Sequence, residues 1–348
     1  MPHPEAAYLD FRPDQSRAIA LASQTIADLG GPEAKGAAFE ARAFADQLEK
    51  GLDEKQRSLL QRFDEGNVST LMFRQMRCAD EPIPEHLPEI CDLAQSPRCL
   101  YLASRNQLLL ELARHRSFAF DIDNEGKQVR LVGNFKGGGR IPRPNEPPCL
   151  AVETSSHAGL YLGPHTEAPY NCSTIARNGH SPAPSALILT ARWNPANEPT
   201  HVFPLREIIE CLSSLDTLAL TSRSFDFTRS DCFAKGKGNA GKEVSILQFE
   251  PNGGFSIRYN SYRFRLGDRA CNAAARAFTT FQKKLENAQP LAFVLQPDSE
   301  LLINNSRALH VATGFRTTGA CSSVNSDTPP SRNRWFSLKT RFWFVVNH

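Results

Sequence analysis

The sequence predicts a mainly β protein with flanking helices, in which a sandwich or barrel of strands is buttressed by helices. Helical periodicity is concentrated in the first third of the chain, and short apolar runs separated by Pro, Gly and Asn turns follow from about residue 117. One long helical pattern interrupts these runs near the end. Strands and helices do not alternate as βαβ units, so a doubly wound parallel sheet is not expected.

The predicted helices have apolar residues three to four positions apart among Ala, Gln, Glu and Arg. They cover residues 14–29, 33–52, 54–63, 104–115 and, late in the chain, 268–288. A strand at 68–73 interrupts the early helices. We therefore expect residues 1–116 to form a mainly helical N-terminal part.

The predicted strands are short and rich in β-branched and aromatic residues. They cover residues 118–122, 128–132, 159–162, 185–191, 244–249, 255–264, 291–295, 301–304 and 335–346. Three polar segments, 171–184, 234–242 and 317–333, have the composition of loops. Because no linker or internal repeat divides the chain, we expect a single domain over 1–348, with the strand-rich core at 117–348.

The charge balance argues against a polyanionic partner. The 348 residues include 40 Lys and Arg against 37 Asp and Glu, which is a net charge of +3 without a basic patch. The chain has no apolar run long enough to cross a membrane, and its first residues lack the order of a secretory signal. We therefore expect a cytoplasmic protein that binds neither nucleic acid nor membrane.

The cysteines limit the kinds of metal site. There are nine, an odd number, and no two form a C-x-x-C pair. This pattern suits reduced thiols better than disulfides or a zinc cage. A metal ion must therefore be held by His, Asp or Glu.

A candidate metal site begins at His165-Thr-Glu167, at the end of a predicted strand. Residues two apart on a strand project to the same face, so His165 and Glu167 can bind one ion together. His310 follows two predicted strands and supplies a third ligand. Two His and one carboxylate on one side of an ion are typical of non-haem Fe(II) oxygenases. By residue type alone, the rival histidine ligands are His157, His180 and His201.

The motifs around these residues resemble a known enzyme group. They are HTEAPY at 165–170, SALILTARWNPANEPTHVFPLREI at 185–208, LLINNSRALH at 301–310 and RNRW at 332–335. Together they are similar to the Fe(II)/2-oxoglutarate dioxygenases of the clavaminate synthase and taurine dioxygenase group, particularly the asparagine and arginine hydroxylases. The resemblance can be followed over about residues 65–348. It implies a double-stranded β-helix, which is a jelly roll of the cupin type.

The resemblance also implies roles for particular residues. His165, Glu167 and His310 would bind the iron, Arg334 would hold the far carboxylate of 2-oxoglutarate, and Thr200 would assist it. An arginine suits this task because its planar fork donates two parallel hydrogen bonds. Arg332 and Arg341 are the alternatives to Arg334 if the strand register differs.

The chain departs from the family pattern in two places. The polar segment 317–333 lengthens the connection between His310 and Arg334. Leu338 stands where the amino-acid hydroxylases often have an arginine that binds the substrate carboxylate. The candidates for the substrate pocket are therefore Leu338 and Leu162, and we expect the segments 171–184, 234–242 and 317–333 to surround its mouth.

The implied activity uses Fe(II) as cofactor with 2-oxoglutarate and O2 as cosubstrates. It would hydroxylate an unactivated C–H bond of an amino acid or an amino-acid-derived molecule, either free or tethered to a peptide or carrier, in natural-product metabolism. The chemistry would be centred on the iron, with no separate acid or base. The alternatives are a desaturase or cyclase with the same cosubstrates, a zinc hydrolase with the same ligands, and a jelly-roll binding protein without catalysis.

Overall fold

The fold was analysed in a computed structural model of the whole chain. The structure describes residues 3–84, 86, 88–119, 122–123, 126–133, 163–172, 183–230, 233, 238–250 and 253–311. For residues 312 and 341–347 it describes the backbone only. All structural statements below concern these residues.

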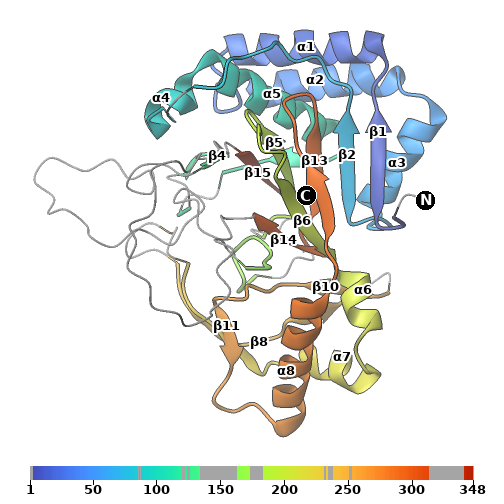
Figure 1. The fold of residues 1–348 in the computed structure, drawn as a ribbon, viewed down its shortest axis with the longest axis vertical. Helices are drawn as coiled ribbons and strands as arrows, with labels where there is room; N and C mark the ends of the chain where they lie inside the picture. Colours follow the sequence, from blue (N-terminus) through green and yellow to red (C-terminus); the bar gives the residue numbers. More distant parts are fainter. Residues whose placement is uncertain are drawn as a thin grey trace, which may run out of the picture.

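A layer of helices covers one face of the main sheet (Figure 1). Helix α5, Pro97–Leu112, packs against both α1, Pro13–Asp28, and α2, Ala37–Lys50. The apolar side of the layer joins Ile19 and Leu108 to strand residues such as Leu71 and Ile188 in one buried cluster. The layer also contains α3, Glu54–Asp64, while the short α4, Ile90–Gln95, precedes α5.

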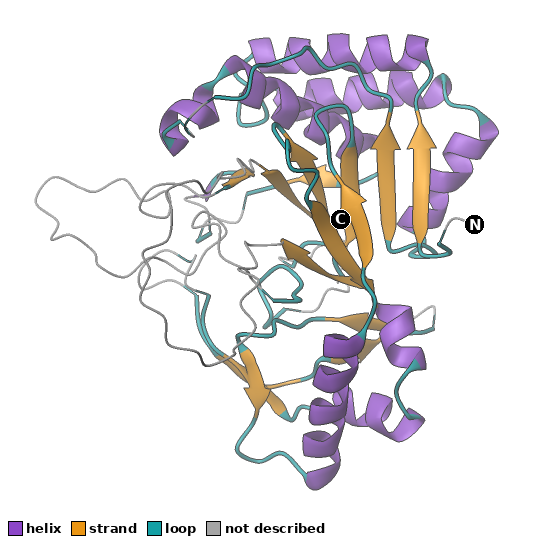
Figure 2. Ribbon diagram, in the orientation of Figure 1, coloured by secondary structure: helices purple, strands orange, loops and turns teal. Residues whose placement is uncertain are grey.

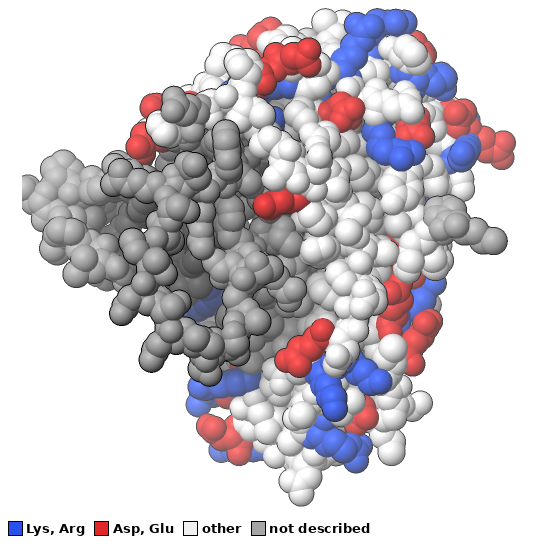
Figure 3. Space-filling view, in the orientation of Figure 1, with Lys and Arg blue, Asp and Glu red and all other residues white. Residues whose placement is uncertain are grey.

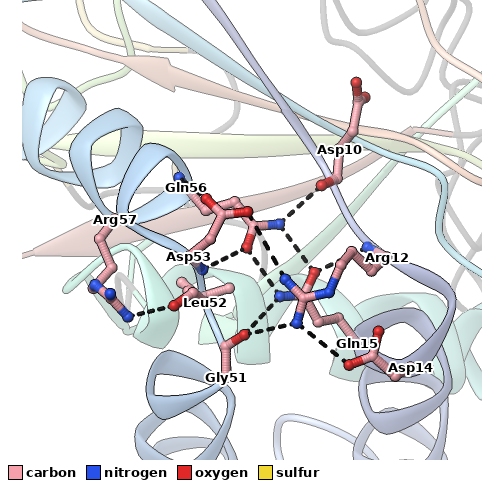
Figure 4. Close-up of polar contacts among 9 residues, drawn as sticks. All are labelled: Asp10, Arg12, Asp14, Gln15, Gly51, Leu52, Asp53, Gln56 and Arg57. Carbon is pink, nitrogen blue, oxygen red and sulfur yellow. Dashed lines mark hydrogen bonds and ion pairs between the residues drawn. The ribbon is translucent and has the colours of Figure 1, made fainter.

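Local hydrogen bonds explain where helix α3 begins. Asp53 accepts a hydrogen bond from the Gln56 backbone N–H, and the Gln56 side chain accepts one from Asp53 N–H, which is a capping box for α3 (Figure 4). The Gln56 amide also donates to the Asp10 carbonyl and exchanges hydrogen bonds with Gln15. This box therefore ties α3 to the first strand and to α1.

The main sheet has seven strands among the described residues. Their order is β1-β2-β13-β5-β15-β3, with β4 also paired to β15. The strands are drawn in orange in Figure 2. The bounds are β1 Ala6–Asp10, β2 Thr70–Arg74, β13 Glu300–Asn304, β5 Ala186–Ala191, β15 Arg341–Asn347, β3 Arg116–Ser117 and β4 Val129–Val132. Only β1 and β2 are parallel. All six residues of β5 are buried, because this central strand is covered on both faces.

A smaller sheet faces the main sheet on the side away from the helices. Its strands are β12 Leu291–Val294, β6 Pro199–Pro204 and β14 Ala308–Ala312, in that order and all antiparallel. Leu189 and Leu301 of the main sheet share a buried cluster with Val202 and Phe293 of the smaller one. The two sheets therefore pack face to face around a common apolar interior.

A second apolar cluster lies under the smaller sheet, at the opposite end of the molecule from α1 and α2 (Figure 1). Helix α8, Asn272–Asn287, buries Phe278 and Phe281 in it. The remaining elements there are α6 Leu205–Glu210, α7 Ser214–Leu220, β7 Phe225–Phe227, β8 Gly241–Val244, β9 Leu247–Phe249, β10 Phe255–Ile257 and β11 Phe264–Leu266.

The structure agrees with the predicted class, a mainly β protein with helices. Residues 1–116 contain α1 to α5, and β2 corresponds to the strand predicted at 68–73, but β1 was not predicted; β1 and β2 together form the edge of the main sheet. The helix predicted at 104–115 begins earlier, at Pro97, where Ser96 caps it and proline occupies the first turn. The helix predicted from residue 33 begins at Ala37, after Gly36 with a φ of 91°.

Several predicted strands also differ in extent. The strand predicted at 118–122 is replaced by the two-residue β3 at Arg116–Ser117. Those predicted at 244–249 and 255–264 are each divided, into β8 and β9 and into β10 and β11. The second division occurs where Asn260 pairs with His165 instead of continuing a hairpin. The predicted strand 159–162 lies outside the described residues.

The described surface has no region of one charge sign on the face shown in Figure 3, where basic and acidic side chains are interspersed. This distribution agrees with the near-neutral composition. In the part of the chain that the structure describes, we find no helix that is long and apolar enough to span a membrane.

Candidate metal centre

The segment around His165 extends the smaller sheet. His165 forms antiparallel bridges to His310 on one side and to Asn260 on the other. His310 is in turn opposite Val202 in the pairing of β14 with β6. Because directly paired residues project to the same face, the side chains of His165, His310 and Asn260 lie in one row.

Glu167 completes a group of three possible metal ligands. Its Oε1 is 3.3 Å from His310 Nε2 and 3.8 Å from His165 Nε2. One ligand atom from each of the three residues lies within 4.8 Å of the others. Adjacent ligands bound about 2.1 Å from an ion would be about 3 Å apart, so small side-chain shifts would suffice to close around it. The structure therefore brings together the three residues that the sequence predicted.

The hydrogen bond of the His165 ring determines which nitrogen faces the group. His165 Nδ1 is 2.7 Å from the Gly163 carbonyl oxygen, which can only accept a hydrogen bond. Nδ1 must therefore carry the proton, which leaves the Nε2 lone pair directed to the side of Glu167. Metal-binding histidines are oriented by this kind of second hydrogen bond.

The protonation states also suit a metal ion. Burial, followed by the neighbouring His310, lowers the pKa of His165 to about 4. Burial alone would raise the pKa of Glu167, but the hydrogen bond from His310 and the charges of His165 and His310 outweigh it and lower that pKa to about 2. At neutral pH the site therefore offers a neutral imidazole at His165 and an ionised carboxylate.

Side chains that are not ligands hold the backbone of this segment. Thr166 N–H donates to the Tyr259 carbonyl at 2.8 Å, and Tyr259 N–H donates to Thr166 Oγ1 at 3.2 Å. The Tyr170 hydroxyl donates to the Thr166 carbonyl at 3.0 Å. Asn305 Oδ1 accepts a hydrogen bond from Glu167 N–H at 2.8 Å. The sequence analysis did not single out Asn305, although it lies in the motif LLINNSRALH.

Thr200 lies near this group, on the same face of the smaller sheet as His310. In the pairing of β6 with β14, Thr200 is opposite Ala312 and Val202 is opposite His310, so the two pairs are adjacent on one face. The side chain of Thr200 is 1% exposed, and its Oγ1 has no hydrogen-bond partner among the described residues. A buried hydroxyl of this kind is costly unless a ligand or water pairs with it.

Two arginines place positive charge near the ligand group. Arg130 is among the groups that lower the pKa of Glu167, and Arg263 is among those that lower the pKa of His165. Arg130 and Leu189 both pair with Trp343, so Arg130 projects from the main sheet to the side of the interior cluster. The sequence analysis missed both arginines, because only the tertiary fold brings them near His165.

The ligand group fits a divalent transition-metal ion such as Fe(II). Two imidazole nitrogens and one carboxylate oxygen approach from one side, which is the donor set of the two-His, one-carboxylate iron sites.

Of the rival histidines, His201 is opposite Val311, so its side chain projects to the opposite face of β6 from the one that faces His310. Several predicted site residues lie outside the described residues: His157, Leu162, His180, Arg332, Arg334 and Leu338. Arg341 begins β15, where only the backbone is described.

The loops expected around the mouth are also mostly outside the described residues. Of the segment 171–184 only 171–172 and 183–184 are described, of 234–242 only 238–242, and 317–333 is not described. Within the second segment, residues 241–242 already belong to β8. The predicted arrangement of these loops therefore stays a prediction.

Comparisons with known proteins identify the fold. No protein-family profile matches the sequence, and no curated protein sequence matches it. Among solved structures, the non-haem iron oxygenase OrfP in complex with Fe and alpha-ketoglutaric acid matches with a TM-score of 0.65 and 18% identity, over 97% of this chain and 93% of that one. Asparagine oxygenase in complex with Fe(II), 2S,3S-3-hydroxyasparagine and succinate matches with a TM-score of 0.65 and 16% identity, over 98% and 93%.

A third structure, OrfP with Fe and L-canavanine, matches with a TM-score of 0.66 and 17% identity, over 97% of this chain and 93% of the other. The chain therefore has the fold of these non-haem iron oxygenases, a mainly β-sheet fold with helices, over nearly its whole length. This is the group to which the sequence motifs pointed.

Proposed function

We propose that this protein is an Fe(II)- and 2-oxoglutarate-dependent oxygenase that hydroxylates an unactivated C–H bond of an amino acid or an amino-acid-derived molecule. The observation that carries the proposal is the convergence of His165, Glu167 and His310 from distant parts of the chain on one buried point. The fold shared with iron oxygenases that were crystallised with alpha-ketoglutaric acid or succinate supports it.

In this proposal His165, Glu167 and His310 hold the iron, and Arg334 with Thr200 binds 2-oxoglutarate. The buried hydroxyl of Thr200 has no hydrogen-bond partner in the part of the chain that the structure describes, which supports its role because a carboxylate oxygen would accept its hydrogen bond. The iron would supply O2 activation coupled to decarboxylation of 2-oxoglutarate to succinate. The protein's own part is to orient both cosubstrate and substrate and to keep the interior between the sheets dry.

Arginine charge near the site supports an acidic ligand, with the charge of Arg130 shared with its ion-pair partner Asp123. Arg130 and Arg263 both lie close enough to affect the pKa values of the ligand residues. Amino acids carry a carboxylate, and the structural neighbours were crystallised with L-Arg, L-canavanine and a hydroxyasparagine. We infer that the substrate is likewise an amino acid or a derivative of one, free or tethered, in specialised metabolism. Leu162 and Leu338 stay the candidates for its apolar contacts.

The proposal extends to architecture and location. The two facing sheets would form a double-stranded β-helix, and residues 1–348 would form one domain. The described cysteines, Cys78, Cys91, Cys99, Cys172, Cys211 and Cys271, are all free thiols, which suits a reducing compartment such as the cytoplasm.

The decisive experiment is an anaerobic titration of the protein with Fe(II) and 2-oxoglutarate. We expect a weak visible charge-transfer band from the chelate, and its absence in the Glu167→Ala variant. A screen of amino acids, including L-arginine and L-asparagine, for stimulated succinate release would then identify the substrate. If the unsubstituted protein binds Fe(II) but gives no band with 2-oxoglutarate, the proposed function is wrong and the zinc-hydrolase or binding-protein alternatives gain support.

A further inference from the structure

Asn305 occupies a turn that joins two parts of the metal site. It lies between β13 and β14, five residues before His310, and is 1% exposed. Its Oδ1 accepts a hydrogen bond from Glu167 N–H at 2.8 Å, and its Nδ2 donates to the Pro184 carbonyl at 2.9 Å. Both contacts are between residues more than a hundred positions apart in the chain.

The orientation of the Asn305 amide follows from its partners. A backbone N–H can only donate and a carbonyl can only accept, so the oxygen must face Glu167 and the nitrogen must face Pro184. Asn305 N–H also donates to the Ser185 carbonyl at 2.9 Å. The side chain is therefore held by two hydrogen bonds and the backbone by a third, and the side chain cannot rotate away from Glu167 without losing buried hydrogen bonds.

The turn between β13 and β14, together with β14 itself, thus contacts or carries all three ligand residues. β14 carries His310, whose backbone pairs with His165, while the turn before β14 carries the amide that holds Glu167. Glu167 itself has no regular strand partner, because the pairing of this segment with its neighbours ends at Thr166. We propose that Asn305 is a positioning residue that sets the direction of the Glu167 carboxylate toward His165 and His310.

The neighbouring residue Asn304 supplies a matched control. Its side chain accepts hydrogen bonds only within its own turn, from Ser306 N–H at 3.0 Å and from the Ser306 hydroxyl at 2.8 Å. Asn304 therefore stabilises the turn without touching the segment 165–167. A general effect of damage to the turn would appear in both variants, whereas an effect through Glu167 would appear only at Asn305.

The test measures Co(II) binding, because Co(II) takes similar ligands without reacting with O2 and has a visible spectrum that reports ligand geometry. The variants are Asn305→Ala, Asn304→Ala, Glu167→Ala and the double variant Glu167→Ala/Asn305→Ala. Outer partners of metal ligands typically contribute about 10–100-fold to metal affinity, so Asn305→Ala should weaken Co(II) binding by that factor and alter its spectrum. Asn304→Ala should stay within about threefold of the unsubstituted protein.

The Glu167→Ala background separates positioning from general structural damage. If Asn305 acts through Glu167, adding Asn305→Ala to Glu167→Ala should leave Co(II) affinity unchanged within about threefold. The inference would be overturned if Asn305→Ala reduced Co(II) affinity equally with and without Glu167→Ala. It would also be overturned if Asn305→Ala alone left Co(II) affinity unchanged. If Asn305→Ala does not fold, Asn305→Ser takes its place, because it leaves room for a water in the vacated space. Its Co(II) affinity is then compared in the same two backgrounds.

The inference rests on the proposed metal site but can fail separately from it. If the unsubstituted protein binds no Co(II), or if Glu167→Ala binds it as tightly, the metal site itself is wrong. If those two results are as expected and Asn305→Ala binds like the unsubstituted protein, only the role of Asn305 is wrong.

Discussion

Burial and hydrogen bonding act on individual residues to prepare the metal centre. The pKa of His165 is lowered to about 4 mainly by burial, so no proton competes for its nitrogen at neutral pH. The Gly163 carbonyl fixes the tautomer, and the Glu167 carboxylate stays ionised next to both histidines. These residues therefore need little rearrangement to accept a cation, which is the advantage of a preorganised site.

Removing a ligand should abolish turnover. We expect Glu167→Ala and His310→Ala each to eliminate formation of succinate from 2-oxoglutarate, because two remaining ligands hold Fe(II) weakly and in the wrong geometry. The measurement is succinate release with added Fe(II), with circular dichroism as the control for folding. Iron-dependent turnover in both folded variants would contradict the ligand assignment.

Thr200 should affect the cosubstrate without affecting the metal. Thr200→Val keeps the shape of the side chain but removes the hydroxyl that has no partner among the described residues. A hydrogen bond to a charged group is worth about 1.5 kcal/mol, so 2-oxoglutarate affinity should fall by about tenfold. The charge-transfer band gives this affinity, and Co(II) binding should not change. An unchanged 2-oxoglutarate affinity would show that Thr200 does not contact the cosubstrate.

At the level of elements, short-range signals determine where helices begin, and pairing determines the strands. The capping box of α3 is readable in the sequence as Asp53 followed by Gln56, and the structure adds the link from Gln56 to Asp10 and Gln15 (Figure 4). Strand β14, in contrast, gives a weak local signal but pairs along its whole length with β6. His310 is therefore positioned by a neighbouring strand and not by its own sequence.

Loss of the α3 cap should destabilise the protein slightly. Asp53→Ala removes the acceptor for Gln56 N–H, and such N-cap changes cost about 1 kcal/mol in the free energy of unfolding. Asp28→Ala, at the last residue of α1, is the control and should change it by less than about 0.5 kcal/mol. Urea unfolding measures both. Equal effects of the two substitutions would contradict the role of the capping box.

For the molecule as a whole, one buried ion pair connects the helical layer to the main sheet. The guanidinium of Arg105 on α5 contacts the carboxylate of Glu300 on β13, and both side chains are 0% exposed. Thr190 of β5 also donates to Glu300, and Arg105 donates to the Pro297 carbonyl at 2.6 Å. Breaking such a pair leaves an uncompensated buried charge, although an apolar replacement of both partners is often tolerated.

We expect Arg105→Met to lower the free energy of unfolding by about 3–5 kcal/mol, because Glu300 would lose its buried partner. The double variant Arg105→Met/Glu300→Gln should recover part of this loss. Thermal or urea unfolding of the metal-free protein gives the comparison. A single variant as stable as the unsubstituted protein would show that the pair contributes little.

The same pair should make stability depend on pH. Burial raises the pKa of Glu300 to about 7 against the lowering effects of Arg105 and Thr190. Between the ordinary value of 4.5 and about 7, the folded state therefore binds more protons than the unfolded state, and stability falls as pH rises through this window. The urea midpoint of the unsubstituted protein, relative to that of Glu300→Gln, should therefore fall from pH 5 to pH 8. A relative urea midpoint that does not vary with pH would contradict the raised pKa of Glu300.

The three candidate metal ligands were predictable because their signal is local. His165 and Glu167 are two positions apart near a strand end, and the motifs around them and around His310 are contiguous stretches of sequence. The class of fold was predictable for a related reason, since helical and strand periodicities are properties of short windows. The capping residues of α3 belong to the same category.

Other features depend on contacts between segments that are distant in the chain, and a short stretch of sequence carries no signal of such contacts. β1 becomes a strand because β2 pairs with it, although three helices separate the two strands in the sequence. Asn305 meets Glu167, Arg130 approaches the same carboxylate, and Arg105 finds Glu300 only after the sheets and the helical layer have packed. The sequence thus names the candidate ligands of the proposed metal centre, while long-range pairing and burial decide how these residues are held, which charges surround them and in which protonation state they remain.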